Sequence, residues 1–97
     1  PERALDAPAQ IEINEYSVER RTLTVNSVGQ IAEYEFNALL DVTVIRGEET
    51  YQFVTESRRT LSNDVNNVVA TQQEERQLRD ALDSDLLSRL MRRLERL

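Results

Sequence analysis

Hydrophobic and polar residues alternate along the first half of the chain, which is the pattern of half-buried β-strands. Between residues 10 and 25, Ile11 and Ile13 alternate with polar neighbours, and Tyr16 and Val18 follow in a shifted phase. Arg20-Arg21 interrupts the pattern, and Leu23 and Val25 resume it. This predicts either one long strand with a bulge or two short strands. The clearest alternation lies between Gln30 and Ile45. One face of that predicted strand carries Tyr34, Phe36, Ala38, Leu40, Val42 and Val44.

The opposite face of the same segment is mostly polar. It carries Glu33, Glu35, Asn37, Asp41 and Thr43. One apolar and one polar face are typical of an antiparallel sheet with one side in water. We therefore interpret Glu33 and Glu35 as part of a solvated surface rather than as a catalytic carboxylate pair.

Two short segments are predicted to be hairpin turns. The first is Asn26-Ser27-Val28-Gly29, in which Asn and Gly tolerate the positive φ that such loops require. The second is Arg46-Gly47-Glu48-Glu49. A third strand is expected over Thr50 to Leu61. The residues sharing one of its faces are Tyr51, Phe53, Thr55, Ser57, Arg59 and Leu61.

From about Asp64 onward the pattern changes to that of an amphipathic helix. Leucine recurs every four residues, at Leu78, Leu82, Leu86, Leu90 and Leu94. This spacing produces a broad stripe, which packs on a sheet better than in a two-stranded coiled coil. Two helix starts compete: Ser62-Asn63-Asp64 offers N-cap residues, and Thr71-Gln72-Gln73-Glu74 has the spacing of a capping box. We favour one helix that begins near residue 64.

These elements predict an α+β fold, with an antiparallel sheet of about three to four strands packed by one long C-terminal helix. The 97 residues are expected to form a single domain, because a chain of this length holds one hydrophobic core. Its strands are expected over 10–61 and its helix over 64–97. Residues 1–9 contain both prolines and no hydrophobic period, so we interpret them as a linker or the remnant of a preceding element.

Composition excludes several classes of function. The chain has 18 acidic and 12 basic residues and a net charge of −6, which argues against nucleic-acid binding. Cysteine and histidine are absent, which removes thiolate and imidazole chemistry and most zinc or copper sites. The sequence contains no Walker, EF-hand or dinucleotide-binding motif. We therefore expect no catalytic residues, no metal and no cofactor.

Arginine accounts for every basic residue, and two arginine doublets are candidates for ligand binding. Arg20-Arg21 and Arg58-Arg59 lie in predicted strands, where adjacent side chains point to opposite faces. Guanidinium groups bind phosphate in a fork, so one hypothesis is an anion clamp shared by neighbouring strands. The alternative is ordinary pairing with surface carboxylates. The arginines at 89, 92, 93 and 96 are interpreted as complementing the helix dipole and aiding solubility.

Three segments share motifs with one known family: Val28 to Phe36, Arg59 to Ala70 and Glu74 to Leu94. They resemble the LptE family of lipopolysaccharide-assembly lipoproteins. Val28 to Phe36 resembles a family hairpin with a G-x-x-x-E-Y-x-hydrophobic pattern. Arg59 to Ala70 resembles the segment that follows it, and Glu74 to Leu94 resembles the closing helix. Together the segments cover roughly residues 10–97. Family members begin with a lipobox Cys, a first strand and a first helix, none of which is present here; a restored first strand would make the sheet mixed.

The resemblance implies a non-enzymatic function. LptE-like proteins plug and assemble the LptD β-barrel and assist lipopolysaccharide transport to the outer leaflet. The implied partners are an LptD-like barrel and lipopolysaccharide. The implied location is the periplasmic side of the outer membrane, through an N-terminal lipid anchor absent from this chain. The alternative is a protein–protein adaptor that docks a partner through its amphipathic helix.

The candidate site residues form two groups on this interpretation. The lipopolysaccharide-binding candidates are Arg58, Arg59, Ser27 and Thr71. Ser27 and Thr71 stand where some relatives carry basic residues, and neither is basic here. The candidates for the partner interface lie in the two turns. They are Asn26, Val28, Gly29, Gln30, Arg46 and Gly47.

Overall fold

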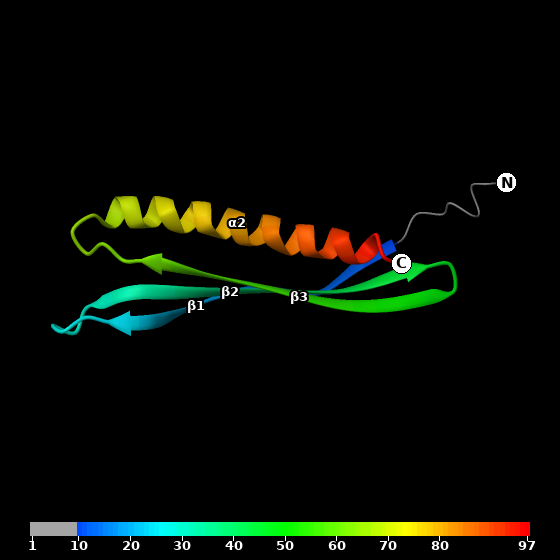
Figure 1. Ribbon diagram of the computed structural model, residues 1–97, viewed down its shortest axis with the longest axis horizontal. Coiled ribbons are helices and arrows are strands. Elements are labelled where there is room, and N and C mark those ends of the chain that lie inside the picture. Colours follow the sequence, from blue (N-terminus) through cyan, green and yellow to red (C-terminus); the bar gives the residue numbers. More distant parts are fainter. Residues whose placement is uncertain (1–9) are drawn as a thin grey trace.

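The computed structural model describes residues 10–97, so the interpretation of residues 1–9 lies outside the described part of the chain. Its elements follow one another as β1 (Gln10–Val25), β2 (Ile31–Arg46), β3 (Glu49–Ser62) and α2 (Val68–Leu94). The strands form one antiparallel sheet in the order β1-β2-β3. Helix α2 runs along one face of this sheet, as Figure 1 shows. The predicted α+β fold is therefore confirmed.

Strand β1 is one long strand rather than two short ones. Ile13 pairs with Val42, a register shift follows, and Tyr16 then pairs with Leu40. Residues directly opposite each other in an antiparallel pair lie on the same face, so this shift keeps Ile11 and Ile13 as well as Tyr16 and Val18 on the side of the helix. The change of phase in the sequence is thus the mark of a bulge.

Both predicted turns form. The Asn26 side-chain oxygen accepts hydrogen bonds from the backbone N–H groups of Val28 (3.0 Å) and Gln30 (2.9 Å). Gly29 has φ +83° and Gly47 has φ +65°, values in the left-handed region that glycine adopts without strain. These two glycines allow long strands to reverse direction within a few residues.

The core lies between strands β2 and β3 and the leucine stripe of α2. The predicted inner face of β2 is buried from Phe36 to Val44, and α2 contributes three buried leucines. The buried apolar residues are Phe36, Ala38, Leu40, Val42, Val44, Leu61, Leu82, Leu86 and Leu90. Alternation in the strand and four-residue spacing in the helix therefore meet at one interface, as predicted.

Helix α2 begins later than the sequence indicates. Asn67 is its N-cap, and the Asn67 side chain accepts a hydrogen bond from the backbone N–H of Ala70 at 3.1 Å. Asp64, the favoured start, instead accepts from the backbone N–H of Asn66 and lies in a turn. Thr71 is inside the first helical turn, so the alternative start at that residue is also wrong. The sequence offers several Asn and Asp residues that could cap the helix. In the structure the connection after β3 places Asn67 at the N-cap position.

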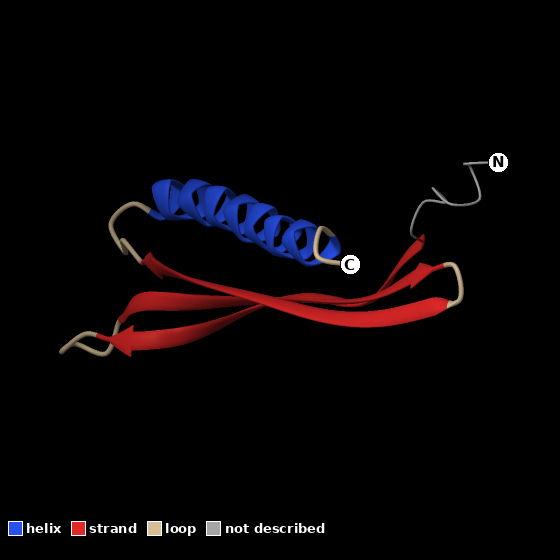
Figure 2. Cartoon of the chain, turned by 45° about the vertical axis from the view of Figure 1, so that its right-hand side comes forward, coloured by secondary structure: helices blue, strands red, loops and turns tan. Residues whose placement is uncertain are grey.

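The molecule is long and narrow, with Cα extents of 67 × 19 × 18 Å. The β1–β2 turn and the start of α2 lie at one end, and the β2–β3 turn and the chain's C-terminus lie at the other, as Figures 1 and 2 show. Within residues 10–97, no helix has the length and apolar character to cross a membrane.

Candidate functional site

The sheet separates the members of each arginine doublet. Arg20 and Arg59 lie opposite Phe36 in the register, on the face covered by the helix. Arg21 pairs with Glu35 in the register and Arg58 pairs with Asn37, both on the opposite face. The four arginines therefore do not converge on one clamp, because the two-residue period of a strand divides them.

Glu35 forms ion pairs with Arg21 and Arg58, the two arginines on the face opposite the helix. Its carboxylate accepts a hydrogen bond from Arg21 Nε at 2.7 Å and lies 3.7 Å from Arg58 Nη1. Asn37 Nδ2 also donates to it, at 3.0 Å. The hydrogen bond from Asn37, aided by the two guanidinium groups, lowers the pKa of Glu35. Glu35 is only 5% exposed, so its interpretation as part of a solvated surface is wrong: cross-strand neighbours cover it.

Polar side chains of β1 connect the sheet to the helix through an ion pair and a hydrogen bond. Arg20 lies over the ring of Tyr34 at 4.7 Å and reaches Glu75 of α2 at 3.7 Å. The hydroxyl of Tyr16 donates a hydrogen bond to Asp83 of the same helix. These contacts fix β1 to α2 across the edge of the core.

Asp85 makes the corresponding tie on the β3 side. Its carboxylate accepts a hydrogen bond from the Ser57 hydroxyl at 2.6 Å and lies 3.4 Å from Arg89 Nε. The hydrogen bond from Ser57, with smaller contributions from Arg89 and Arg59, lowers the pKa of Asp85. Arg59 is exposed, and among residues 10–97 no carboxylate forms an ion pair with it. Its positive charge nevertheless contributes to the electrostatic potential at Asp85.

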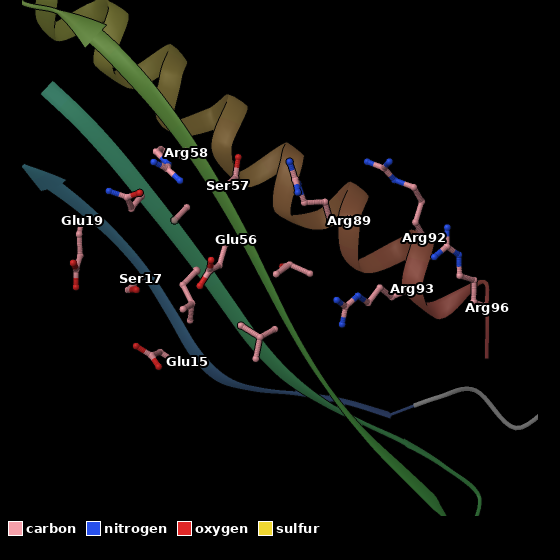
Figure 3. Close-up of a pocket in the computed structure, with 15 residues that line it drawn as sticks. Glu15, Ser17, Glu19, Glu56, Ser57, Arg58, Arg89, Arg92, Arg93 and Arg96 are labelled. Carbon is pink, nitrogen blue, oxygen red and sulfur yellow. The ribbon is translucent and has the colours of Figure 1, made fainter. Parts of the chain in front are cut away.

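An open groove of about 1010 Å³ follows the middle of β3 (Figure 3). One side of the groove is formed by arginines of α2 and of the turn after it, and the other includes Glu15, Ser17 and Glu19 of β1. Strand β3 runs between them. The arginines are Arg89, Arg92, Arg93 and Arg96. Glu15, Ser17 and Glu19 pair with Asp41, Leu39 and Asn37, so they lie on the face of the sheet opposite the helix. The basic and the acidic residues therefore border β3 from its two sides.

The predicted site residues are distributed along the whole molecule. Ser27 lies in the β1–β2 turn at one end, together with the interface candidates Asn26, Val28, Gly29 and Gln30. Arg46 and Gly47 lie in the β2–β3 turn at the other end.

Thr71 and Arg58 differ in how accessible their polar groups are. The Thr71 hydroxyl is buried, donates to the Asn67 carbonyl and accepts from the Asp64 N–H. Arg58 is exposed and lines the groove. The predicted ligand-binding set thus belongs to several surfaces, of which the groove contains one member.

Sequence reasoning missed a set of exposed apolar residues on β1. They are Ile11, Ile13, Tyr16, Leu23 and Val25, each at least 40% exposed. The alternation predicts which residues share a face, but it does not say whether a second layer covers that face. The number of predicted elements could have indicated this exposure. One helix about 10 Å wide cannot cover three twisted strands, spaced about 4.8 Å apart, along their whole length, so part of the inner face must stay exposed.

Comparisons with known proteins extend the description. The family model described as "LptE: Lipopolysaccharide-assembly" matches residues 2–94, which include all three strands and α2. The chain is also similar to the rare lipoprotein B from Shewanella oneidensis, a solved crystal structure, with a TM-score of 0.67 and 27% sequence identity. That match covers 90% of this chain and 70% of the other. No curated protein sequence matches the chain.

Proposed function

This chain belongs to the LptE family of lipopolysaccharide-assembly proteins, and we propose that it plugs and assembles an LptD-type β-barrel. In this role it assists lipopolysaccharide transport to the outer leaflet without catalysing a reaction. It acts at the periplasmic side of the outer membrane, held by a lipid anchor N-terminal to the sequence given. The observation that carries the proposal is the family match over residues 2–94.

The shape of the molecule supports a position inside a wide barrel. Its Cα cross-section is 19 × 18 Å, whereas outer-membrane barrels of 22 strands or more have a lumen large enough to hold a plug. Its length of 67 Å exceeds the apolar band of such a barrel, which is about 25 Å tall. A plug of these dimensions would extend beyond the membrane.

Strand β1 supplies a surface for such a partner. Ile13 is 67% exposed and Ile11 is 44% exposed, although both lie on the helix side of the sheet. Apolar residues gathered on one exposed element are characteristic of interaction surfaces. We propose β1 and the turns at residues 26–30 and 46–47 as barrel contacts, and Arg58, Arg59 and Ser27 as lipopolysaccharide contacts. Thr71, the fourth predicted contact, is left out because its hydroxyl is buried and hydrogen-bonded within the chain.

Co-purification with the barrel tests the function. The full-length lipoprotein, affinity-tagged and co-expressed with the LptD-type barrel of the same cell, is expected to retain that barrel through purification in detergent. The variant Ile11→Thr/Ile13→Thr should reduce recovery at least about fivefold, because central apolar contacts dominate interface energies. Threonine keeps the strand propensity of these positions.

A matched control variant distinguishes a specific contact of β1 with the barrel from nonspecific hydrophobic association. Val68 and Val69 at the start of α2 are 58% and 64% exposed, so Val68→Thr/Val69→Thr removes similar apolar groups elsewhere. Recovery with this variant should match the wild type. Absence of the barrel from wild-type preparations would overturn the proposed function; equal recovery with both double variants would reject β1 as the contact surface.

The adaptor alternative lacks a free helix face. It requires the leucine stripe of α2 to enter a groove on a partner. Leu82, Leu86 and Leu90 are instead buried against the chain's own sheet. The structure therefore favours a role in which the helix stabilises the domain and the sheet and its turns meet the partner.

A further inference from the structure

Four arginines form one basic stripe on the C-terminal half of α2 and the turn that follows it: Arg89, Arg92, Arg93 and Arg96. At about 100° per residue their spacing places all four side chains within an arc of about 100°. The chain as a whole has a net charge of −6, so the stripe is a local reversal of the overall charge. It lines the groove beside β3, as Figure 3 shows.

Only some of these four arginines interact with other side chains of the protein. Arg89 is paired with Asp85, and the guanidinium of Arg93 lies 5.5 Å from the centre of the Phe53 ring. Among residues 10–97, no carboxylate lies within 4.0 Å of the guanidinium nitrogens of Arg92, Arg93 or Arg96. Three positive charges on one wall are therefore available to an anion.

The helix dipole does not account for the whole stripe. A positive charge near the last carbonyls of a helix is favourable, but the effect falls off within one turn. Only Arg92 and Arg93 lie in the last turn of α2, whereas Arg89 precedes it and Arg96 follows the helix. The interpretation of the cluster as a dipole complement is thus incomplete.

A buried hydroxyl in the same groove is a second and independent observation. Thr55 lines the groove and is only 6% exposed. Its Oγ1 has no hydrogen-bond partner in the part of the chain that the structure describes. Its neighbour on the same face, Ser57, donates to Asp85. A buried polar group without a partner is unfavourable. A ligand oxygen that accepts from Thr55, once the side chain turns this buried hydroxyl toward the groove, would remove that cost.

We propose that the basic wall is an anion subsite that binds a phosphate group of the glycolipid. Arg92, Arg93 and Arg96 pair with the phosphate oxygens, and the Thr55 hydroxyl donates to one of them. Guanidinium suits this ligand because its fork of N–H donors matches two phosphate oxygens at once. The subsite rests on the proposed function and adds a binding surface on α2 and β3.

The rest of the groove favours an amphiphilic ligand over a free anion. Glu15 and Glu19 lie on the face of the sheet opposite the helix, across β3 from the arginines, so a phosphate is favoured only on the side of α2. Leu39 and Val54 also line the groove, and Val54 is 43% exposed. Both residues lie on the face opposite the helix, across β3 from the arginines. A ligand that carries both a phosphate and hydrocarbon would reach them by crossing this edge of the sheet.

Binding of purified lipopolysaccharide to the full-length lipoprotein tests the subsite. The triple variant Arg92→Gln/Arg93→Gln/Arg96→Gln should bind at least about tenfold more weakly, since each lost charge-assisted hydrogen bond contributes substantially to affinity. Arg76→Gln is the control, because Arg76 is an exposed helix residue outside the groove. It should change affinity less than about twofold. Equal affinities for wild type and triple variant would overturn the subsite.

Thr55→Val supplies a test that does not depend on changing charge. Valine has nearly the same shape and removes the unpartnered hydroxyl, so the urea midpoint should stay equal or rise while lipopolysaccharide binding weakens several-fold. Unchanged binding together with unchanged stability would remove Thr55 from the site.

Two further ligands identify the chemistry. Dephosphorylated lipopolysaccharide should bind wild type and triple variant equally. Inorganic pyrophosphate should compete weakly; if it binds as tightly as the glycolipid and with the same arginine dependence, the ligand is a free phosphate and the glycolipid assignment fails. Co-purification of the barrel with the wild type, combined with arginine-independent lipopolysaccharide binding, would reject this subsite and leave the proposed function intact.

Discussion

Replacing either of two adjacent leucines in α2 tests how the domain is held together. Leu86 is 1% exposed and packs in the core, whereas Leu87 is 57% exposed. Leu86→Ala and Leu87→Ala remove the same atoms from the same helix and change helix propensity equally. Any difference between their free energies of unfolding therefore reports burial alone.

The expected difference follows from the packing. Truncating a buried leucine to alanine removes three carbons, about 0.8 kcal/mol each in transfer free energy, and leaves a cavity, so measured losses reach about 2–5 kcal/mol. We expect about 3 kcal/mol for Leu86→Ala and less than about 1 kcal/mol for Leu87→Ala. In a domain of this size, 3 kcal/mol lowers Tm by about 12–24 °C.

Urea unfolding followed by far-UV circular dichroism measures both variants, with thermal melts as a second readout. The linear dependence on urea should keep its slope, because the variants expose similar surface on unfolding. Equal losses for the two leucines, or a larger loss for Leu87→Ala, would refute the assignment of the buried helix face and with it the packing of α2 on β2.

Three further predictions concern the cap, a turn and the buried carboxylate. Asn67→Ala should cost about 1 kcal/mol of unfolding free energy because it removes the N-cap hydrogen bond, while Asn66→Ala should cost less than about 0.5 kcal/mol; the reverse order in urea melts would shift the helix start. Gly29→Ala should lower the free energy of unfolding by about 1 kcal/mol, because the φ of Gly29 is +83°. Ser27→Ala in the same turn should leave it unchanged, and equal effects in urea unfolding would contradict the turn conformation. The pKa of Glu35 is lowered by folding, so its contribution to stability is present above its ordinary pKa near 4.5 and is lost as the pH falls through the lower folded value. Glu35→Gln should therefore flatten the acid side of the stability–pH curve measured by urea unfolding, and an unchanged curve would contradict the ion-pair cluster.

The elements were predictable where one local pattern determines them. Alternation from Tyr34 to Val44 identifies the buried face of β2, because a strand with one covered side must alternate. Gly29 and Gly47 mark turns because few other residues adopt their φ values. The leucine spacing identifies the packed stripe of α2 for the same reason: the helical period leaves one face for the sheet.

Features that depend on several segments at once were not predictable. The environment of Glu35 follows from the register that aligns it with Arg21 and places Arg58 beside it, which no local pattern encodes. The helix start depended on which of several capping residues the β3–α2 connection brings into position. The groove required the end of α2 to lie beside Thr55, a relation between residues about 40 positions apart.

The exposed position of β1 has a consequence for the protein before it meets a partner. Within the described residues, β1 is the outer strand of the sheet beside β2, and its 16 residues offer a row of backbone groups to which another chain could add a strand. Such edges are templates for aggregation unless charge or irregular geometry interrupts them. Glu12, Glu15 and Glu19 place negative charge along this edge, and the bulge after Ile13 bends it. We therefore expect the charges and the bulge of β1 to oppose aggregation of the free protein, on the same strand that carries its exposed apolar residues.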